Sequence, residues 1–364
     1  MAKKALDTQT AAAFSAAWLR GEAREEAEEM KATLTGMGKK AQALALEVPE
    51  LLAFMTDQAL SPKNEVDAYL LALDWTANPA VTERMLRYKK NPPQTAPAPK
   101  EKKAPAPSAK DDWTTEKLPD GTWKLKSYKG KDTVVHIPEV LGKARVSVLG
   151  RGLFYPFAQG VDETRQALRK SIREVVIPNG VTAIEDGDYG KGGTFWGCTG
   201  LRSVTIPGSL TSIGALAFLS CENLTDIVLS EKTTYIGHEA FQGCRSLTAI
   251  RISEGVTCIE WNTFLSCRGL RSVVFPDSLL EVKNHAFKGC ESLTEVCLPK
   301  NLTTIGRWAF EGCWNLEKIT IPVSVTEIGK DVFRGCSKLT IHAPAGSYAE
   351  QYAKENKIPF VAEG

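Results

Sequence analysis

The feature that most constrains this chain is a unit of 23 residues that repeats through its C-terminal part. The unit is marked by a phenylalanine, by a cysteine three residues later, and by a leucine three residues after that. The phenylalanines are Phe195, Phe218, Phe241, Phe264, Phe287, Phe310 and Phe333. The cysteines are Cys198, Cys221, Cys244, Cys267, Cys290, Cys313 and Cys336. Because one such unit cannot bury its apolar side alone, a fixed period of this length predicts a stack of units that share one core.

Each unit also contains two extended segments. The first, Leu201 to Ile206 in one unit, is followed by Pro207, which cannot donate to a strand ladder. The second ends in an apolar residue; these residues are Ile184, Ile213, Ile236, Ile259, Val282, Ile305 and Ile328. Glycine follows four of them, and we expect Gly214, Gly237, Gly306 and Gly329 to permit a corner. The predicted fold class is α/β: a leucine-rich-repeat solenoid with a parallel sheet and short helical or 3-10 turns.

The ends of the repeat array are altered. Six extra residues separate Ile184 from Phe195, which predicts a corner loop around residues 188–193. Residues 134–138 and 153–154 indicate an N-terminal capping coil, and a helix is expected over 348–355 in the C-terminal cap. The solenoid domain is therefore predicted to span residues 112–364.

Two further regions precede the solenoid. Residues 1–90 are rich in Ala, Leu, Glu and Lys and contain few strand signals, which predicts a small all-α N-terminal domain. Ser61-Pro62 is a typical helix start, because serine caps free N–H groups and proline suits the first helical position. Residues 91–111 are rich in Pro, Ala and Lys and are predicted to form a semi-extended linker.

The repeat region resembles a known family. The segments Asp120–Thr122, Tyr128–Asp132 and Val134–Pro138 are similar to the N-terminal segment of BspA-like leucine-rich-repeat proteins. The repeat itself and the ending Ala345–Ala349 resemble that family too, so the likeness covers about residues 117–362. It implies bacterial surface or secreted proteins that adhere and bind, with no catalytic residues to carry across. The chain departs from the family in having a helical region where members usually carry an export signal.

Charge and hydropathy bear on partners and location. The formal net charge is +2, so no strong field would recruit nucleic acid, and no run of 18 apolar residues predicts a membrane span. The absence of a clear signal peptide favours the cytoplasm, whereas the family resemblance implies the cell surface or secretion. Both locations stay open at this stage, and the sequence does not determine the oligomeric state.

The cysteine column invites a chemical role, but its spacing favours packing. Neighbouring coils stack about 4.8 Å apart, whereas disulfides prefer Cβ atoms about 3.8 Å apart. No Cys-x-x-Cys pair or histidine accompanies the column, as zinc sites usually require. Cys258 replaces residues that are mostly polar in other units and is expected to be exposed, and Cys297 is expected to point outward from its strand. A redox role for these two stays open.

No motif for catalysis is found. The glycine-rich residues 187–193 lack the phosphate-loop pattern, and no Gly-x-Ser-x-Gly elbow is present. We therefore predict no catalytic residue, no cofactor, no metal and no enzyme activity.

Function is then expected on variable surface positions. On the strand side, residues that alternate with the core should point outward; the partner-binding candidates are Thr205, Asp226, Val228, Arg251, Val274, Glu295, Lys318 and Thr320. On the turn side the candidates are Trp261, Trp308 and Trp314, since exposed aromatics often anchor partners. The alternatives are a solvated sheet without a partner and tryptophans that fold over a neighbouring coil or the linker.

The prediction is a non-enzymatic module of the protein-binding or adhesion type, whose partner is a protein or another macromolecule. The alternative is a structural or delivered, effector-like protein whose helical N-terminal domain carries assembly or activity.

Overall fold

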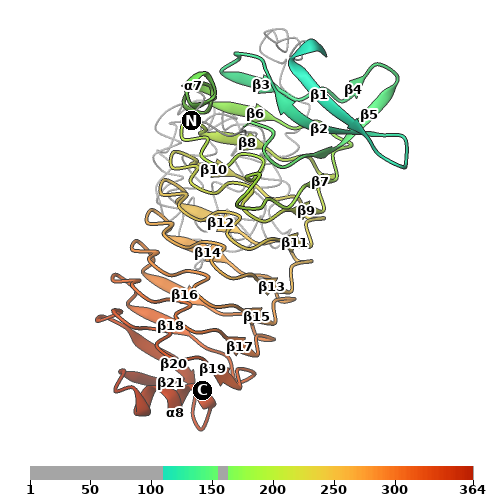
Figure 1. Cartoon of the computed structure of the whole chain (residues 1–364). Helices are drawn as coiled ribbons and strands as arrows, with labels where there is room; N and C mark the ends of the chain where they lie inside the picture. The colour runs from blue at the N-terminus through green and yellow to red at the C-terminus, as the bar shows by residue number, and fades with distance from the viewer. Residues whose placement is uncertain (1–109, 155–162, 364) are drawn as a thin grey trace, which may run out of the picture. The chain divides into compact units, whose positions relative to one another are not determined.

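The computed structural model describes residues 110–154 and 163–363, which form a solenoid (Figure 1). The predicted helical domain over 1–90 and almost all of the predicted linker over 91–111 lie outside the described residues. The fold class expected for the repeat region is confirmed, because each 23-residue unit forms one coil of a parallel β-solenoid.

Every coil has two strand sides and one turn side. The strands of the first side are β6 (Glu174–Val176), β8 (Ser203–Thr205), β10 (Asp226–Ile227), β12 (Ala249–Arg251), β14 (Ser272–Val274), β16 (Glu295–Cys297), β18 (Lys318–Thr320) and β20 (Thr340–Pro344). The strands of the second side are β7 (Ala183–Ile184), β9 (Ser212–Ile213), β11 (Tyr235–Ile236), β13 (Cys258–Ile259), β15 (Glu281–Val282), β17 (Thr304–Ile305) and β19 (Glu327–Ile328). Figure 1 shows these two columns of strands running side by side in chain order.

Neighbouring strands pair in parallel with a register of one repeat. Ile250 pairs with Val273, for example, and Ile213 pairs with Ile236. Equivalent residues of successive coils therefore stack on one another and form continuous columns. Among the described strands, the first ladder is interrupted between β10 and β12 and between β14 and β16, and the second ladder between β11 and β13.

A phenylalanine column fills the interior. Rings of adjacent coils from Phe195 to Phe333 have centroids 4.8–5.9 Å apart and are tilted by at most 18°. Phe264 and Phe287 are fully buried, as the repeat predicts. Phe154 of the N-terminal cap stacks on Phe195 at 5.3 Å and so begins the column.

The cysteine column packs beside the phenylalanines, and none of the nine cysteines is in a disulfide. Each thiol from Cys221 onward donates to the backbone carbonyl of the phenylalanine in the preceding coil, over Sγ to O distances of 3.0–3.3 Å. That carbonyl also accepts an N–H within its own coil; the Phe241 oxygen, for instance, accepts from Cys244 N and from Cys267 Sγ. Cysteine thus supplies both a small apolar volume and a weak donor.

The corner glycines have a different role from the predicted one. Gly214, Gly237, Gly306 and Gly329 do not have positive φ angles. They are needed because the preceding coil passes close by: a Cβ on Gly237 would lie 2.3 Å from the backbone nitrogen of Ala215. Left-handed backbone occurs instead beside the cysteines, at Gly197, Ser220, Gly243, Ser266, Gly289, Gly312 and Gly335.

On the turn side, alternate N–H groups bond within the coil and to the next coil. Phe218 N donates to Ala240 O at 2.7 Å, whereas Leu219 N donates back to Leu216 O at 3.2 Å. This alternation gives isolated three-residue turns rather than a continuous 3-10 helix. It is accompanied by a left-handed residue two positions before each phenylalanine from Phe218 onward; these residues are Leu216, Glu239, Asn262, His285, Trp308 and Asp331.

The two ends of the solenoid are capped. At the N-terminal end a short 3-10 helix (Lys110–Asp112) leads into the antiparallel pair β1 (Trp113–Lys117) and β2 (Trp123–Tyr128). β3 (Val134–His136), β4 (Val140–Leu141) and β5 (Ala144–Leu149) follow, and helix α7 (Glu163–Ser171) precedes the first regular coil. The β1–β2 hairpin and α7 were not predicted.

At the C-terminal end, α8 (Tyr348–Glu355) has the predicted bounds and is capped by the Ser347 side chain. β21 (Phe360–Glu363) then pairs in parallel with β20.

Candidate functional site

The strand-side candidates lie on the outer surface of the first column of strands. Thr205 and Arg251 are exposed, Val228 is 41% exposed, and Val274 and Thr320 are half-buried. Lys318 forms an ion pair with Glu295 at 3.0 Å on the neighbouring coil. Asp226 lies on β10, opposite Ser203. The surface mixes small, apolar and charged residues.

The three tryptophans do not share one site. Trp261 and Trp308 both lie on the turn side, two coils apart, and Trp261 is 47% exposed. Trp314 follows Cys313 at a different corner, where its indole nitrogen would be 3.4 Å from a Cβ on Gly335. Trp314 is 58% exposed and forms no ring stack among the residues that the structure describes.

Each turn-side tryptophan is stacked on a histidine of the preceding coil. The His238 and Trp261 rings have centroids 4.6 Å apart and are tilted by 11°, and the His285 and Trp308 rings are 4.9 Å apart and tilted by 10°. Burial, and then the charge of Lys288, lower the pKa of His285. These histidines were not predicted from the sequence. The sequence could have indicated them, because each histidine lies 23 residues, or one repeat, before the tryptophan on which it stacks.

The predicted corner loop adds two more rings to this side. Tyr189 is 64% exposed and meets Trp196 edge-on, with centroids 5.9 Å apart. Its hydroxyl donates to the Glu239 carboxylate two coils away. Burial, and then this hydrogen bond, raise the pKa of Tyr189 to about 12. Trp196 packs on a small apolar cluster of Ala215, Leu216 and Leu219, which is separate from the main core.

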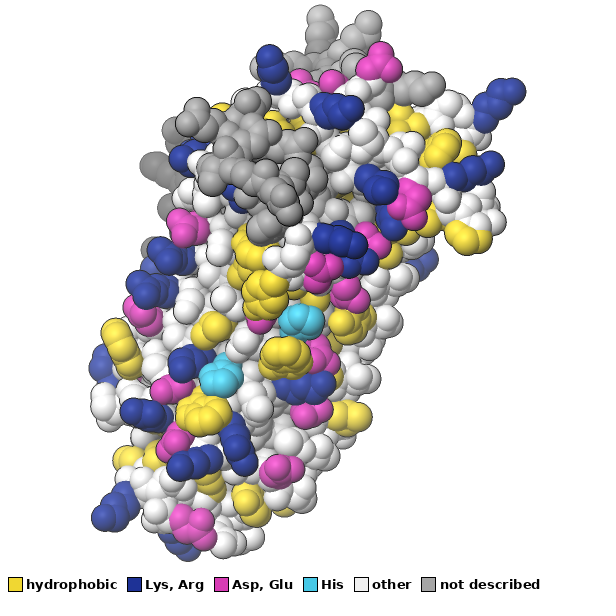
Figure 2. Space-filling view, viewed as in Figure 1, with side chains coloured by type: hydrophobic (Ala, Val, Ile, Leu, Met, Phe, Trp, Pro, Cys, Tyr) yellow, Lys and Arg dark blue, Asp and Glu magenta, His cyan; other side chains and the backbone are white. Residues whose placement is uncertain are grey.

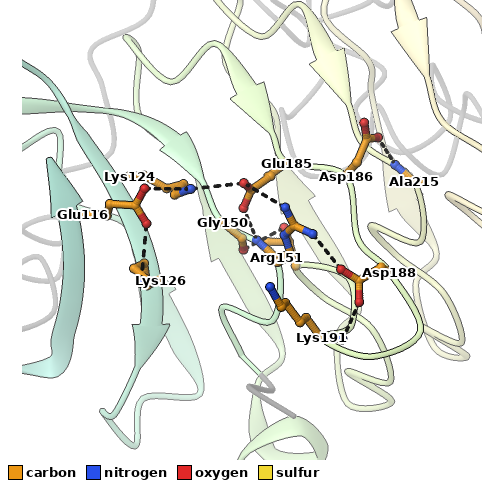
Figure 3. A network of polar contacts seen from close by, with 11 residues as sticks. Glu116, Lys124, Lys126, Gly150, Arg151, Glu185, Asp186, Asp188, Lys191 and Ala215 are labelled. Carbon is orange, nitrogen blue, oxygen red and sulfur yellow. Dashed lines mark hydrogen bonds and ion pairs between the residues drawn. The ribbon is translucent and has the colours of Figure 1, made fainter. Parts of the chain in front are cut away.

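A polar network fixes the base of that loop (Figure 3). The Arg151 guanidinium forms an ion pair with Asp188 at 2.6 Å, and Asp188 also accepts the Gly190 N–H at 2.8 Å. The hydrogen bond from Arg151 is the main cause that lowers the pKa of Asp188. Glu185 accepts the backbone N–H of Arg151 at 2.9 Å and pairs with Lys124 of β2 at 3.1 Å. The loop is therefore attached to the N-terminal cap through charges on both sides.

We name these turn-side residues the ring strip; its members are Tyr189, Trp196, His238, Trp261, His285 and Trp308. Figure 2 shows hydrophobic side chains and two histidines along the middle of one face, with charged side chains on both sides of them. The repeat does not demand rings at these positions, because other coils place Ala215, Asn262 and Asn284 there. The strip offers flat apolar faces with polar edges.

Trp308 occupies a conformation that does not suit it. Its φ is 55°, in the left-handed region, as are those of Asn262 and His285 at 58°. Asn, Asp and His visit this region several-fold more often than other side chains, whereas a bulky residue there is a clear outlier. Such a conformation costs roughly 1–2 kcal/mol. The fold imposes this conformation, since the buried Leu216 adopts it at the equivalent position with a φ of 58°.

Other chemistry has little support in residues 110–154 and 163–363. No group of three or more His, Cys, Asp or Glu side chains there is arranged to hold a metal ion. Cys258 is half-buried rather than exposed, and burial, followed by the charge of Glu260, raises the pKa of its thiol to about 12. Cys297 is exposed as expected, but burial of its sulfur still raises its pKa. Neither thiol has the lowered pKa of a reactive cysteine.

None of the helices within residues 110–154 and 163–363 has the length and apolarity that a membrane span needs.

The chain is similar to leucine-rich repeat proteins of known structure. A leucine-rich repeat protein from Bacteroides ovatus is 29% identical, with a TM-score of 0.52, over 69% of this chain and 66% of that one. The match therefore covers less than two thirds of that protein's length. A leucine rich cell surface protein from Faecalibacterium prausnitzii is 23% identical, with a TM-score of 0.47, over 67% of this chain and 84% of that one. None of the curated proteins matches the chain.

The family profile described as BspA type leucine rich repeat region matches in six copies, over residues 167–293 and 259–348. Together these ranges cover residues 167–348, which is 182 of the chain's 364 residues, or half. This family consists of repeat proteins that are typically non-enzymatic and often found at cell surfaces, and its fold suggests a protein-interaction module. The resemblance found in the sequence is thereby confirmed, and the chain belongs to the BspA-type leucine-rich-repeat family.

Proposed function

We propose that this protein is a non-enzymatic binding protein that recognises a macromolecular partner, most plainly another protein, on the surface of its solenoid. The ring strip carries the proposal. Its tryptophans sit at positions that the repeat leaves free, and Trp261 exposes nearly half of its side chain, 47%, despite stacking on His238. Partly exposed tryptophans are the side chains most often found as energetic centres of protein interfaces.

The strand side is the second candidate surface. Arg251 and the Glu295–Lys318 pair would contribute charge there, around apolar residues such as Val228. A flat sheet of small and charged residues gives fewer deep contacts than projecting aromatics, because binding energy concentrates in a few large side chains. We therefore rank the turn side above the strand side.

The experiment is capture with the full chain and surface variants. One variant carries Trp261→Ala and Trp308→Ala, a second carries Arg251→Glu and Lys318→Glu, and a third carries Trp314→Ala. Each is tagged and incubated with an extract of the organism that produces the protein, and captured proteins are quantified by mass spectrometry. The melting temperature of each variant is measured alongside, so that a folding defect is separated from a binding defect.

The expected result is a partner that is captured by the wild type and by the Trp314 variant and lost from the Trp261/Trp308 variant. If only the strand-side variant fails to capture the partner, the binding site lies on the strand side. If all three variants retain every specific partner, recognition does not use these solenoid residues. The alternative of a structural or delivered protein acting through residues 1–90 would then be preferred.

A further inference from the structure

The N-terminal cap contains a pocket whose lining residues belong neither to the ring strip nor to the strand-side candidates. It lies between the β1–β2 hairpin and the β4–β5 hairpin, at the N-terminal end of the solenoid (Figure 1). We propose that this pocket binds a small molecule in which an aromatic ring carries a carboxylate, with the ring inside the pocket and the carboxylate at its rim. The site is additional to the proposed function and independent of it.

Two hairpins form the walls of the pocket. Trp113, Thr115 and Lys117 alternate along β1, so their side chains share one face of the first hairpin. Trp123 of β2 pairs with Lys117 and also lines the pocket. The opposite wall is the turn of the β4–β5 hairpin, residues 141–144. The volume of about 450 Å³ lies within the range of roughly 300–1,000 Å³ that is typical of small-molecule sites.

The floor of the pocket is apolar. Trp113 and Leu141 are each 7% exposed, and the Trp113 ring packs on the Tyr128 ring, with centroids 4.6 Å apart. The Trp123 Nε1–H already donates to the Leu141 carbonyl at 2.9 Å. The Trp113 Nε1–H has no acceptor among the described residues and is closed off from the surface. Neither indole therefore offers an accessible donor, so a hydroxyl-rich ligand would leave hydroxyls unpaired there, whereas an aromatic ring packs on indole surfaces without such a loss.

The rim of the pocket is cationic. Lys117 on β1 and Lys143 in the β4–β5 turn are exposed, and they stand on opposite walls. Neither lysine forms an ion pair within the part of the chain that the structure describes. A carboxylate at the rim can therefore be bound from both sides, in charge-assisted hydrogen bonds that are stronger than those between neutral groups.

The carboxylates of the cap do not cancel this charge. None of the described Asp or Glu residues lines the pocket. Glu116, the neighbour of Lys117 in β1, pairs instead with Lys124 at 3.3 Å and with Lys126 at 3.5 Å. The other carboxylates of residues 110–154 are Asp111, Asp112, Asp120, Asp132 and Glu139. With Glu116 they make six, against nine Lys and Arg residues in the same segment, so the cap has a formal charge of +3 and favours an anionic ligand.

The test is calorimetric titration of the full chain with three probes. The first is naphthylacetate, which has an aromatic ring and a carboxylate. The second is naphthylacetamide, which keeps the ring and the shape but has no charge. The third is glucuronate, which has a carboxylate on a hydroxyl-rich ring. The wild type should bind naphthylacetate, and bind each of the other two at least about tenfold more weakly, a difference of about 1.4 kcal/mol.

Variants locate the site and separate charge from shape. The double variant Lys117→Gln, Lys143→Gln should weaken naphthylacetate binding at least about tenfold and leave naphthylacetamide binding unchanged, which a misfolded protein could not do. Lys126→Gln is the matched control, because Lys126 is an exposed lysine of the same hairpin that does not line the pocket. It should bind both compounds as the wild type does. Thr115→Phe, at an exposed lining position, should fill the pocket and abolish binding of both compounds without lowering the melting temperature.

Several outcomes would overturn the proposal. If naphthylacetate and its amide bind equally, the lysines do not recognise a carboxylate. If glucuronate binds as tightly as naphthylacetate through Lys117 and Lys143, the ligand is an acidic sugar instead. Equal losses in Lys126→Gln and in the double variant would show non-specific attraction to the charged cap, and a lack of binding by every probe would remove the site. Because none of these substitutions changes the ring strip, capture of a protein partner tests the proposed function separately.

Discussion

The phenylalanine column and the ring strip are both rows of aromatic side chains that follow the solenoid axis, yet they obey different rules. In the column the same residue recurs in every coil, and rings such as Phe241 and Phe264 are fully buried and nearly parallel, tilted by 4°. In the strip the residue type and position change from coil to coil, and exposure reaches 47% at Trp261 and 64% at Tyr189. Packing in the core requires the same residue types in every coil, whereas surface positions can vary between coils. We therefore look for partner-binding residues among the surface positions that vary.

The largest expected effect comes from breaking the column. Phe264→Ala should lower the free energy of unfolding by about 3–5 kcal/mol, because a large cavity is left between two rings that cannot collapse toward each other. Coupling between neighbouring coils should weaken as well, since each coil is stabilised by its neighbours. Urea denaturation measures both, as a lower midpoint and a shallower or biphasic transition. A loss below about 1 kcal/mol would mean that the ring does not fill the core as described.

A smaller effect is expected where coils approach closely. Gly237→Ala places a Cβ 2.3 Å from the Ala215 backbone nitrogen, so the coils must shift apart. Overpacking of this kind costs about 1–3 kcal/mol. Gly208→Ala is the matched control, because a Cβ there meets nothing within 4 Å. Thermal unfolding should separate the two; equal melting temperatures would show that the close approach of the coils does not require glycine at position 237.

The sequence predicted the parts of the solenoid that repeat. The identical spacing of Phe, Cys and Leu placed the inward columns, and the helix over Tyr348–Glu355 was predicted with its observed bounds as part of the C-terminal cap. Contacts between coils were harder to predict, since they depend on how far neighbouring backbones approach. The roles of Gly237 and of the cysteine thiols as donors belong to this class.

The candidate site was predicted only in part. Trp261 was identified because it interrupts a position that is polar in most other coils, and Trp308 as an aromatic residue expected on the surface, but their ring partners His238 and His285 were not predicted. Their role appears only when residues one repeat apart are compared as stacked neighbours. The contact between Tyr189 and Glu239 could not be predicted, because it depends on how the inserted loop folds back over two coils. The domain boundaries and the helical region over 1–90 stay predictions.

A further contrast between core and surface can be measured through pH. Burial raises the pKa of the Cys267 thiol to about 12, whereas an unfolded thiol titrates near about 8.5. Stabilisation by the neutral thiol is therefore complete below about pH 8.5 and is lost as the pH rises toward the folded value. Urea unfolding of the wild type and of Cys267→Ala should converge by about 1.4 kcal/mol for each pH unit above that point. A constant difference between the two proteins would mean that the folded thiol ionises as easily as the unfolded one.

The smallest effect on stability is expected in the strip, at Trp308. Trp308→Asn replaces a bulky residue in the left-handed region by asparagine. Asn262 already occupies the equivalent position two coils earlier. Relief of backbone strain, roughly 1–2 kcal/mol, offsets a stacking energy with His285 of about 0.5–1.5 kcal/mol. The free energy of unfolding should thus change by less than about 1 kcal/mol, against the 3–5 kcal/mol expected for Phe310→Ala two residues away. Chemical denaturation of both variants measures the two changes in the free energy of unfolding. If Trp308→Asn lowers it as much as Phe310→Ala does, the indole is part of the structural core. The distinction between a periodic interior and a variable binding surface would then not hold at this coil.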